Sequence, residues 1–194
     1  MLKLRYRTPR EWLDIATANF DAFLADHAHN ERKVSQSALQ LAVHHPDKPD
    51  LVDAMIEHAR EELEHFSQVH AVLVDRGAAL GFDHSGGNSG YMNKVRSAMR
   101  KVDVGEYLVD RLLLFSIIEA RGCERFRILA EGLPAGEMRD FYTAFVRSEA
   151  RHHVLFLDLA ARYFDAPTIE ARLPDLLDIE AEICASMPLR PALY

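Results

Sequence analysis

The sequence contains few of the residues that interrupt helices or cross-link a secreted fold. Nine glycines and eight prolines occur in 194 residues, and they are confined to a few places, which favours a helical protein. The two cysteines, Cys123 and Cys184, form neither a Cys-x-x-Cys motif nor a disulfide framework. They are therefore typical of a reducing compartment, and we expect the protein to be cytoplasmic.

Long apolar runs and an excess of basic charge are also missing. The longest apolar run, residues 112–118, is far too short to span a bilayer. Residues 1–10 are basic, but no apolar core follows them, so we expect neither a membrane segment nor a signal peptide. The formal net charge of −7 argues against a generally basic nucleic-acid-binding surface, although it leaves room for a local basic patch.

Against this background, one short motif occurs twice. It joins a glutamate to a histidine three residues later, as Glu62 with His65 and as Glu149 with His152. Positions i and i+3 lie on one face of an α-helix, one turn apart. Both side chains of each pair can therefore reach one metal ion.

One further glutamate precedes each motif. Glu31 lies 31 residues before Glu62, and Glu119 lies 30 residues before Glu149. All four glutamates stand in apolar stripes, where leucine or phenylalanine would be expected. Buried carboxylates are costly and repel one another unless cations lie among them, so the pattern indicates metal ligands. Four carboxylates and two imidazoles are the ligand set that helix bundles use for two iron or manganese ions, and they disfavour zinc.

Some neighbouring residues leave the ligand assignment open. Glu61 and Glu64 flank Glu62, but Glu62 fits the apolar stripe better. His153 adjoins His152, but only His152 has the three-residue spacing.

Other residues near the ligands have two possible roles. Glu124 is expected to make a surface ion pair. Gly122, one turn after the third glutamate, either permits close helix packing or leaves space beside the metals. For His27, His29 and His58 we favour core or surface roles over hydrogen bonding to the ligands.

Hydrophobic periodicity and capping residues predict an all-α protein. Four long helices are expected, from Phe20 to before His44, from Asp50 to Gly77, from Asp103 to near Gly132, and from Met138 to before Ala166. Thr8, Asp50 and Asp103 are expected caps, and shorter helices are expected near both termini. The long stretch between the second and third helices predicts one crossover in a ferritin-like four-helix bundle, with residues 1–194 forming a single domain.

Three segments resemble a known family. They are residues 26–33 (DHAHNERK), 118–126 (IEARGCERF) and 148–153 (SEARHH). They are similar to the tRNA 2-methylthio-N6-isopentenyladenosine hydroxylases, and the resemblance covers nearly the whole chain. It implies a ferritin-like fold, and the family's iron ligands fall on the six residues chosen above by spacing.

The resemblance also implies an activity. Such a protein would be a non-haem di-iron monooxygenase that uses dioxygen to hydroxylate the isopentenyl group of the modified adenosine beside the tRNA anticodon. The chain has no flavin or nicotinamide motif, so an external electron donor, a separate reductase or a ferredoxin, is expected. Competing interpretations are iron oxidation and storage, another di-iron hydroxylase such as one acting on quinone precursors, and a non-catalytic helical scaffold.

A cluster of cations is the candidate tRNA-binding segment. Four cations fall within eight residues, just after the glycine-rich stretch 83–92, as Lys94, Arg96, Arg100 and Lys101. If this stretch is helical, Arg96 and Arg100 are neighbours at i+4. A solvated crossover segment is the alternative, in which case tRNA would be held elsewhere, for instance on Arg5, Arg7 and Arg10.

Overall fold

The computed structural model describes residues 2–82, 90–101 and 103–194. In these ranges the chain forms seven helices and no strand, which confirms the all-α prediction. The helices are α1 (Glu11–Ala18), α2 (Phe20–His44), α3 (Pro49–Asp75), α4 (Tyr91–Ser97), α5 (Val104–Gly132), α6 (Glu137–Tyr163) and α7 (Ala166–Ser186). Most of the expected glycine-rich loop lies outside the described residues. Among the helices described, none is both long and apolar enough to cross a membrane.

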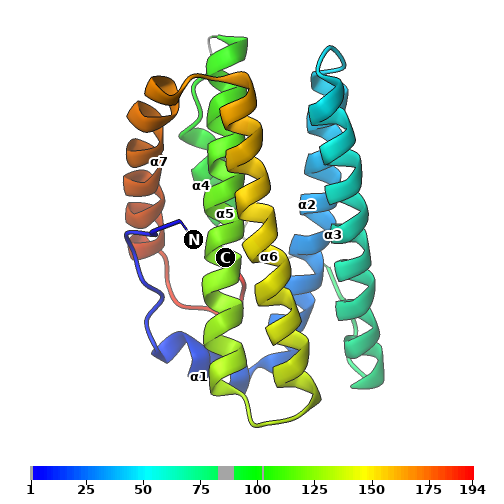
Figure 1. Cartoon of the computed structure of the whole chain (residues 1–194). Coiled ribbons are helices and arrows are strands. Elements are labelled where there is room, and N and C mark those ends of the chain that lie inside the picture. The colour runs from blue at the N-terminus through cyan, green and yellow to red at the C-terminus, as the bar shows by residue number, and fades with distance from the viewer. Residues whose placement is uncertain (1, 83–89, 102) are drawn as a thin grey trace. The chain divides into compact units, whose positions relative to one another are not determined.

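The chain divides into two compact units. One comprises residues 14–85 and 190–193, and the other comprises residues 1–13, 86–189 and 194. Each unit contains a pair of long helices joined by a short connection, α2 with α3 in the first and α5 with α6 in the second (Figure 1). The single domain expected from chain length stays a prediction.

Helices α2 and α3 form an antiparallel hairpin joined by residues 45–48. The Ser35 hydroxyl of α2 donates a 2.8 Å hydrogen bond to the carbonyl oxygen of Ala59 in α3. The expected cap at Asp50 is wrong, because α3 begins at Pro49 and Asp50 lies in its first turn. Proline suits the first helical turn, where its missing N–H costs no hydrogen bond. The expected stop at Gly77 is confirmed by its φ of +71°, which favours glycine.

Helix α5 is buried on nearly every face from Leu108 to Phe126. A helix that is buried on almost all sides belongs inside a core, and α5 packs against α6 and α7. The expected cap is confirmed, since the Asp103 carboxylate accepts a 2.9 Å hydrogen bond from the backbone N–H of Glu106. At the other end of α5, a Cβ on Gly132 would collide with the Leu13 side chain.

The segment before α1 also packs on α5. Thr8 was expected to cap the first helix, but α1 begins only at Glu11. The Thr8 hydroxyl instead donates a 2.8 Å hydrogen bond to the carboxylate of Glu124. This hydrogen bond to α5 therefore takes the place of the cap that Thr8 was expected to provide. Glu124 also pairs with Arg121, which confirms the expected ion pair, but its expected location at the surface is wrong because Arg121 is buried.

Candidate functional site

Helices α2 and α3 bring three of the predicted ligands together. Glu31 comes from α2, and Glu62 and His65 come from successive turns of α3. The Nδ1 atom of His65 lies 3.2 Å from Oε2 of Glu62 and 3.5 Å from Oε2 of Glu31. Both glutamates are buried, at 4% and 1% exposure. Burial of a charged carboxylate is costly unless a partner offsets its charge.

The electrostatics of this group show how tightly its members are coupled. Burial opposes ionisation of Glu31, but the contacts with Glu62, His27 and His65 outweigh it and hold the pKa of Glu31 well below its ordinary value. Burial opposes the charged form of His65 as well, yet Glu31 and Glu62 raise its pKa to about 10. His65 therefore carries a positive charge at neutral pH, which partly offsets the charges of the two carboxylates.

Two further histidines contact these carboxylates. The Nε2 atom of His27 lies 2.8 Å from Oε1 of Glu31, and the Nδ1 atom of His58 lies 3.4 Å from Oε1 of Glu62. Each histidine precedes its glutamate by four residues, and both are buried. Sequence reasoning favoured core or surface roles for them. The repeated His-x-x-x-Glu spacing is the signal that could have identified their contact with the ligands.

Helices α5 and α6 carry the other three predicted ligands. Glu119, Glu149 and His152 are all buried, and the Nδ1 atom of His152 lies 3.6 Å from Oε2 of Glu149. Gly122 lies one turn after Glu119, and a Cβ on it would lie 3.9 Å from Cγ of Glu149. The turn of α5 that carries Glu119 therefore packs closely on Glu149.

The side chain of Tyr194 lies beside Gly122. A Cβ on Gly122 would lie 3.0 Å from the Tyr194 hydroxyl, which itself donates a 3.2 Å hydrogen bond to the carbonyl oxygen of Ile118. The Tyr194 ring stacks on Tyr91 with centroids 5.1 Å apart. Of the two roles expected for this glycine, close packing is the one that these contacts favour.

The alternatives to the predicted ligands differ in burial. Glu61 and Glu64 are exposed whereas Glu62 is buried, which agrees with the choice made from the apolar stripe. His153 is buried beside His152, and its carbonyl oxygen accepts a 2.8 Å hydrogen bond from the Ser116 hydroxyl. Burial alone therefore does not separate the two adjacent histidines, and the three-residue spacing remains the argument for His152.

Both groups of ligands suit a hard cation. In an octahedral site with metal–oxygen distances near 2.1 Å, adjacent donor atoms lie about 3 Å apart. The donor separations within α2–α3 and within α5–α6 are 3.2 to 3.6 Å, close to that value. Each pair offers two buried carboxylates and one imidazole, which suit iron or manganese. A metal would also neutralise carboxylates that are otherwise expensive to bury.

The four predicted tRNA-contacting cations lie in different surroundings. Lys94 and Arg96 are in α4, but this helix ends at Ser97, so the helical pairing of Arg96 with Arg100 is wrong. Arg96 and Lys101 are exposed, and Lys94 is half-buried.

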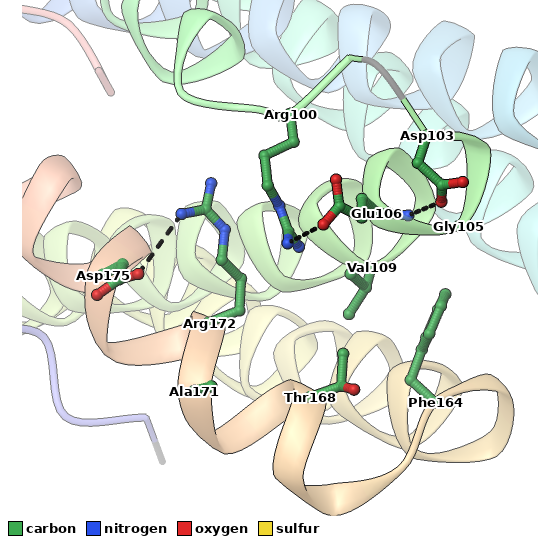
Figure 2. A pocket seen from close by; sticks show the side chains of 10 residues that line it. All are labelled: Arg100, Asp103, Gly105, Glu106, Val109, Phe164, Thr168, Ala171, Arg172 and Asp175. Carbon is green, nitrogen blue, oxygen red and sulfur yellow. Dashed lines mark hydrogen bonds and ion pairs between the residues drawn. The ribbon is translucent and has the colours of Figure 1, made fainter.

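Arg100 is held by carboxylates of α5. Its guanidinium donates to Asp110 at 2.7 Å and to Glu106 at 2.8 Å. Arg172 of α7 binds the same Asp110 at 2.9 Å. The two arginines line a pocket of about 600 Å³ whose wall also carries three carboxylates, Asp103, Glu106 and Asp175 (Figure 2). The positive charge of Arg100 is therefore largely offset within the protein.

Buried carboxylates and imidazoles on paired antiparallel helices are typical of the ferritin-like class of helical proteins. A solved structure with the same fold, titled Protein 43 with aldehyde deformylating oxygenase activity from Synechococcus, superposes with a TM-score of 0.91. The two sequences are 34% identical, and the match covers 98% of this chain and 93% of that one. The family is more specific still: residues 2–193 match the model of tRNA-(MS[2]IO[6]A)-hydroxylase (MiaE), and the chain belongs to that family.

Two curated relatives agree with this assignment. The tRNA 2-(methylsulfanyl)-N(6)-isopentenyladenosine(37) hydroxylase of Pseudomonas putida is 36% identical over 88% of this chain and 80% of its own length. The protein of the same name from Salmonella typhimurium is 33% identical over 80% of this chain, and the match spans 55% of its own length.

Proposed function

We propose that the protein hydroxylates the isopentenyl group of 2-methylthio-N6-isopentenyladenosine in tRNA, beside the anticodon. The observation that carries this proposal is membership of the hydroxylase family over almost the whole chain. The two curated relatives, whose names state this activity, support it. Six residues of the type and spacing that a di-iron oxygenase needs, five of them buried and His65 half-buried, supply an independent physical argument.

The six predicted ligands would together hold two iron ions. They are Glu31, Glu62, His65, Glu119, Glu149 and His152, three from each helix pair. When bound, the irons would supply the activation of dioxygen that hydroxylation of a C–H bond requires. His27 and His58 would hold the carboxylates of α2 and α3 in the orientation that the metals need.

The ligands of α5 and α6 lie among aromatic side chains. Phe115 and Phe145 stand one turn before Glu119 and Glu149, and both are buried. Such side chains keep water from the ligands and suit an apolar prenyl group better than a polar substrate. The protein's contribution is thus to position the metals, exclude water and receive an apolar tail.

The reaction needs partners that the chain does not contain. Hydroxylation with dioxygen consumes two electrons from outside, and no flavin or nicotinamide motif is present. A separate reductase or ferredoxin would therefore supply them. A tRNA substrate and the two buried free cysteines are consistent with a cytoplasmic location.

For tRNA binding, two exposed cations and one half-buried cation around α4 are candidates. Lys94, Arg96 and Lys101 would contact phosphates, which position a nucleic acid without reading its sequence. Arg100 would act differently, because its pairing with Asp110 and Glu106 anchors the segment to α5.

Nucleoside analysis of tRNA tests the function. The gene is expressed in cells that make the isopentenyl-modified nucleoside but lack a hydroxylase for it. We expect the hydroxylated nucleoside to appear with the wild-type gene and to be absent with a Glu62→Ala variant. If the tRNA is unchanged by the wild-type protein, although that protein is folded and loaded with iron, the proposal fails.

A second function deserves a parallel assay because a specific observation favours it. The Synechococcus structure is named for aldehyde deformylating oxygenase activity and is as similar in sequence as the curated relatives. The iron-loaded protein is therefore incubated with a long-chain aldehyde, dioxygen and a reducing system. Turnover of the aldehyde, with none of the tRNA nucleoside, would transfer the assignment to that activity.

A further inference from the structure

The segment before α1 has a regular pattern of exposure. Residues 2–8 are non-helical with a bend at positions 5 and 6, and they run beside α7 in the blue part of Figure 1. Lys3, Arg5 and Arg7 are exposed, whereas the residues between them are half-buried. In an extended chain, alternate side chains point to opposite faces. One face of this segment therefore packs on the protein and the other is a row of cations.

The inward-facing residues fix the segment to α5. The guanidinium of Arg121 lies 5.7 Å from the centre of the Tyr6 ring. The backbone N–H of Thr8 donates to Glu124 at 3.3 Å, and the Thr8 hydroxyl accepts from Nε of Arg125 at 3.3 Å. Arg121 and Arg125 are themselves buried, so these contacts hold the segment against the core. Arg5 is tied to α7 through an ion pair with Asp178.

Three cations of this region are available for a ligand. Lys3, Arg7 and Arg10 are exposed, and the structure of the described residues gives them no ion pair or side-chain hydrogen bond. Residues 1–10 contain no carboxylate, although the chain as a whole has a net charge of −7. A local field of the opposite sign to that of the whole protein is what attracts and orients an anionic partner.

We propose that the segment 3–10, with Lys3, Arg7 and Arg10 as its contact residues, binds the phosphate backbone of the RNA substrate. Lys3 and Arg7 are four residues apart and Arg7 and Arg10 are three apart, so their Cα atoms lie at most about 14 Å and about 11 Å apart, and the three side chains can meet phosphates along one strand. Two of the three are arginines, whose planar guanidinium suits phosphate in a bidentate geometry. The inference rests on the proposed function, since it takes tRNA as the substrate.

A lipid surface is the other polyanion that a basic segment could bind. Membrane-bound segments insert apolar side chains between their cations. Here Leu2, Leu4 and Tyr6 are half-buried against the protein, and none belongs to the large exposed apolar residues of the described chain. The segment offers charge without an apolar anchor, which favours RNA.

Salt-dependent tRNA binding tests the proposal. The variant Lys3→Gln/Arg7→Gln/Arg10→Gln is compared with Lys48→Gln/Arg60→Gln/Arg147→Gln, which changes the net charge equally but on α2–α3 and on α6. Binding of the iron-loaded proteins to tRNA is measured as a function of salt, with circular dichroism and iron content as checks on folding. Loss of three phosphate contacts should reduce the slope of log K against log salt by about 2, with weaker binding at every salt concentration. The control variant should keep at least most of the wild-type slope.

The outcomes separate this inference from the function on which it rests. If the wild type hydroxylates tRNA and the N-terminal variant binds it with the wild-type slope, the inference is wrong and the function stands. If both triple variants lose the same slope, the effect is one of net charge and the inference is also wrong. If the N-terminal variant alone loses slope while the wild type shows no hydroxylation, the surface is real and the function is wrong. Binding to phosphatidylserine vesicles but not to tRNA would show that the segment binds a membrane surface and that the inference is wrong.

Discussion

The two helix pairs carry the same ligands in different surroundings. In α2 and α3, the residue four positions before each glutamate is a histidine, His27 or His58, and it contacts that glutamate. At the equivalent positions of α5 and α6 the residues are Phe115 and Phe145. Seven residues after the glutamates, α5 and α6 carry phenylalanines again, Phe126 and Phe156, whereas α2 and α3 carry Ala38 and Val69.

This difference separates two requirements of a buried metal site. Carboxylates must be oriented, and in α2 and α3 a neighbouring histidine contacts each of the two predicted glutamate ligands. Water must also be kept out, and the aromatic side chains of α5 and α6 do so for the other ligands. The Phe115 and Phe156 rings pack with centroids 5.0 Å apart, and those of Phe126 and Phe145 are 5.3 Å apart. The same motif thus stands among polar neighbours in α2 and α3, which we call the polar half, and among aromatic neighbours in α5 and α6, which we call the apolar half.

Loss of one ligand from either pair should have the largest effect. Glu149→Ala, His152→Ala and Glu62→Ala should each abolish hydroxylation, because an incomplete ligand set does not hold two irons. The measurement is turnover of modified tRNA by iron-reconstituted protein. The metal-free Glu149→Ala protein should fold normally and unfold at the same or a higher denaturant concentration, because a buried charge has been removed. Full activity in any of the three would remove that residue from the ligand set.

The apolar half should contribute more to stability than the polar half. Phe145→Ala should lower the free energy of unfolding of the metal-free protein by about 3–5 kcal/mol, because it opens a cavity among Phe126, Phe141 and Tyr142. Val69→Ala in α3 removes less buried volume and is the matched comparison. Urea unfolding measures both, and equal losses would show that the aromatic side chains of α6 have no special part in the core.

The polar half should govern metal affinity. His58→Phe gives α3 the residue type found in α6 and removes the contact with Glu62. It should weaken iron binding by roughly 10–100-fold, as loss of a residue that orients a ligand does. His70→Phe, on an exposed position of the same helix, is the control and should leave the affinity unchanged. Wild-type affinity in His58→Phe would mean that Glu62 is oriented without His58.

Periodicity and spacing predicted the parts of this comparison that depend on local sequence. The long helices, the Asp103 cap, the Gly77 stop and the burial of Glu62 rather than Glu61 follow from patterns within a few turns. Thr8 and Arg100 were misjudged because their partners, Glu124 and Asp110, come from elsewhere in the fold. Local rules read Thr8 as a cap and Arg100 as a free cation. Both partners lie on α5, and only the folded structure brings them close to Thr8 and Arg100.

The smallest expected effect is on the pH dependence of stability, to which His65 of α3 and Cys184 of α7 contribute in different pH windows. In the metal-free protein, contacts with Glu31 and Glu62 raise the pKa of His65 from 6.5 to about 10, so its stabilisation is complete below pH 6.5 and is lost as pH rises toward 10. Burial raises the pKa of Cys184 from 9.0 to about 12, so above pH 9 the unfolded chain loses a proton that the folded chain keeps. Stability therefore falls with rising pH in both windows, for different reasons.

Urea midpoints as a function of pH separate these two contributions. A His65→Gln variant should lose the decline that begins near pH 6.5, and a Cys184→Ser variant should lose part of the decline above pH 9. The buried phenol of Tyr91 also has a raised pKa, but it adds only above its ordinary value of 10.0. An unchanged decline near neutral pH in His65→Gln would contradict the role given to its imidazolium.

Iron titration of three proteins tests most directly whether the two halves form one centre. The metal-free wild type, Glu62→Ala from α3 and Glu149→Ala from α6 are titrated with ferrous iron without oxygen, and bound iron is counted. The account predicts about two irons per chain in the wild type. It also predicts that either substitution weakens the binding of both irons, because carboxylates from each pair serve the same two ions. One iron retained with wild-type affinity in each variant would show that the helix pairs bind metal independently, and the account would be wrong.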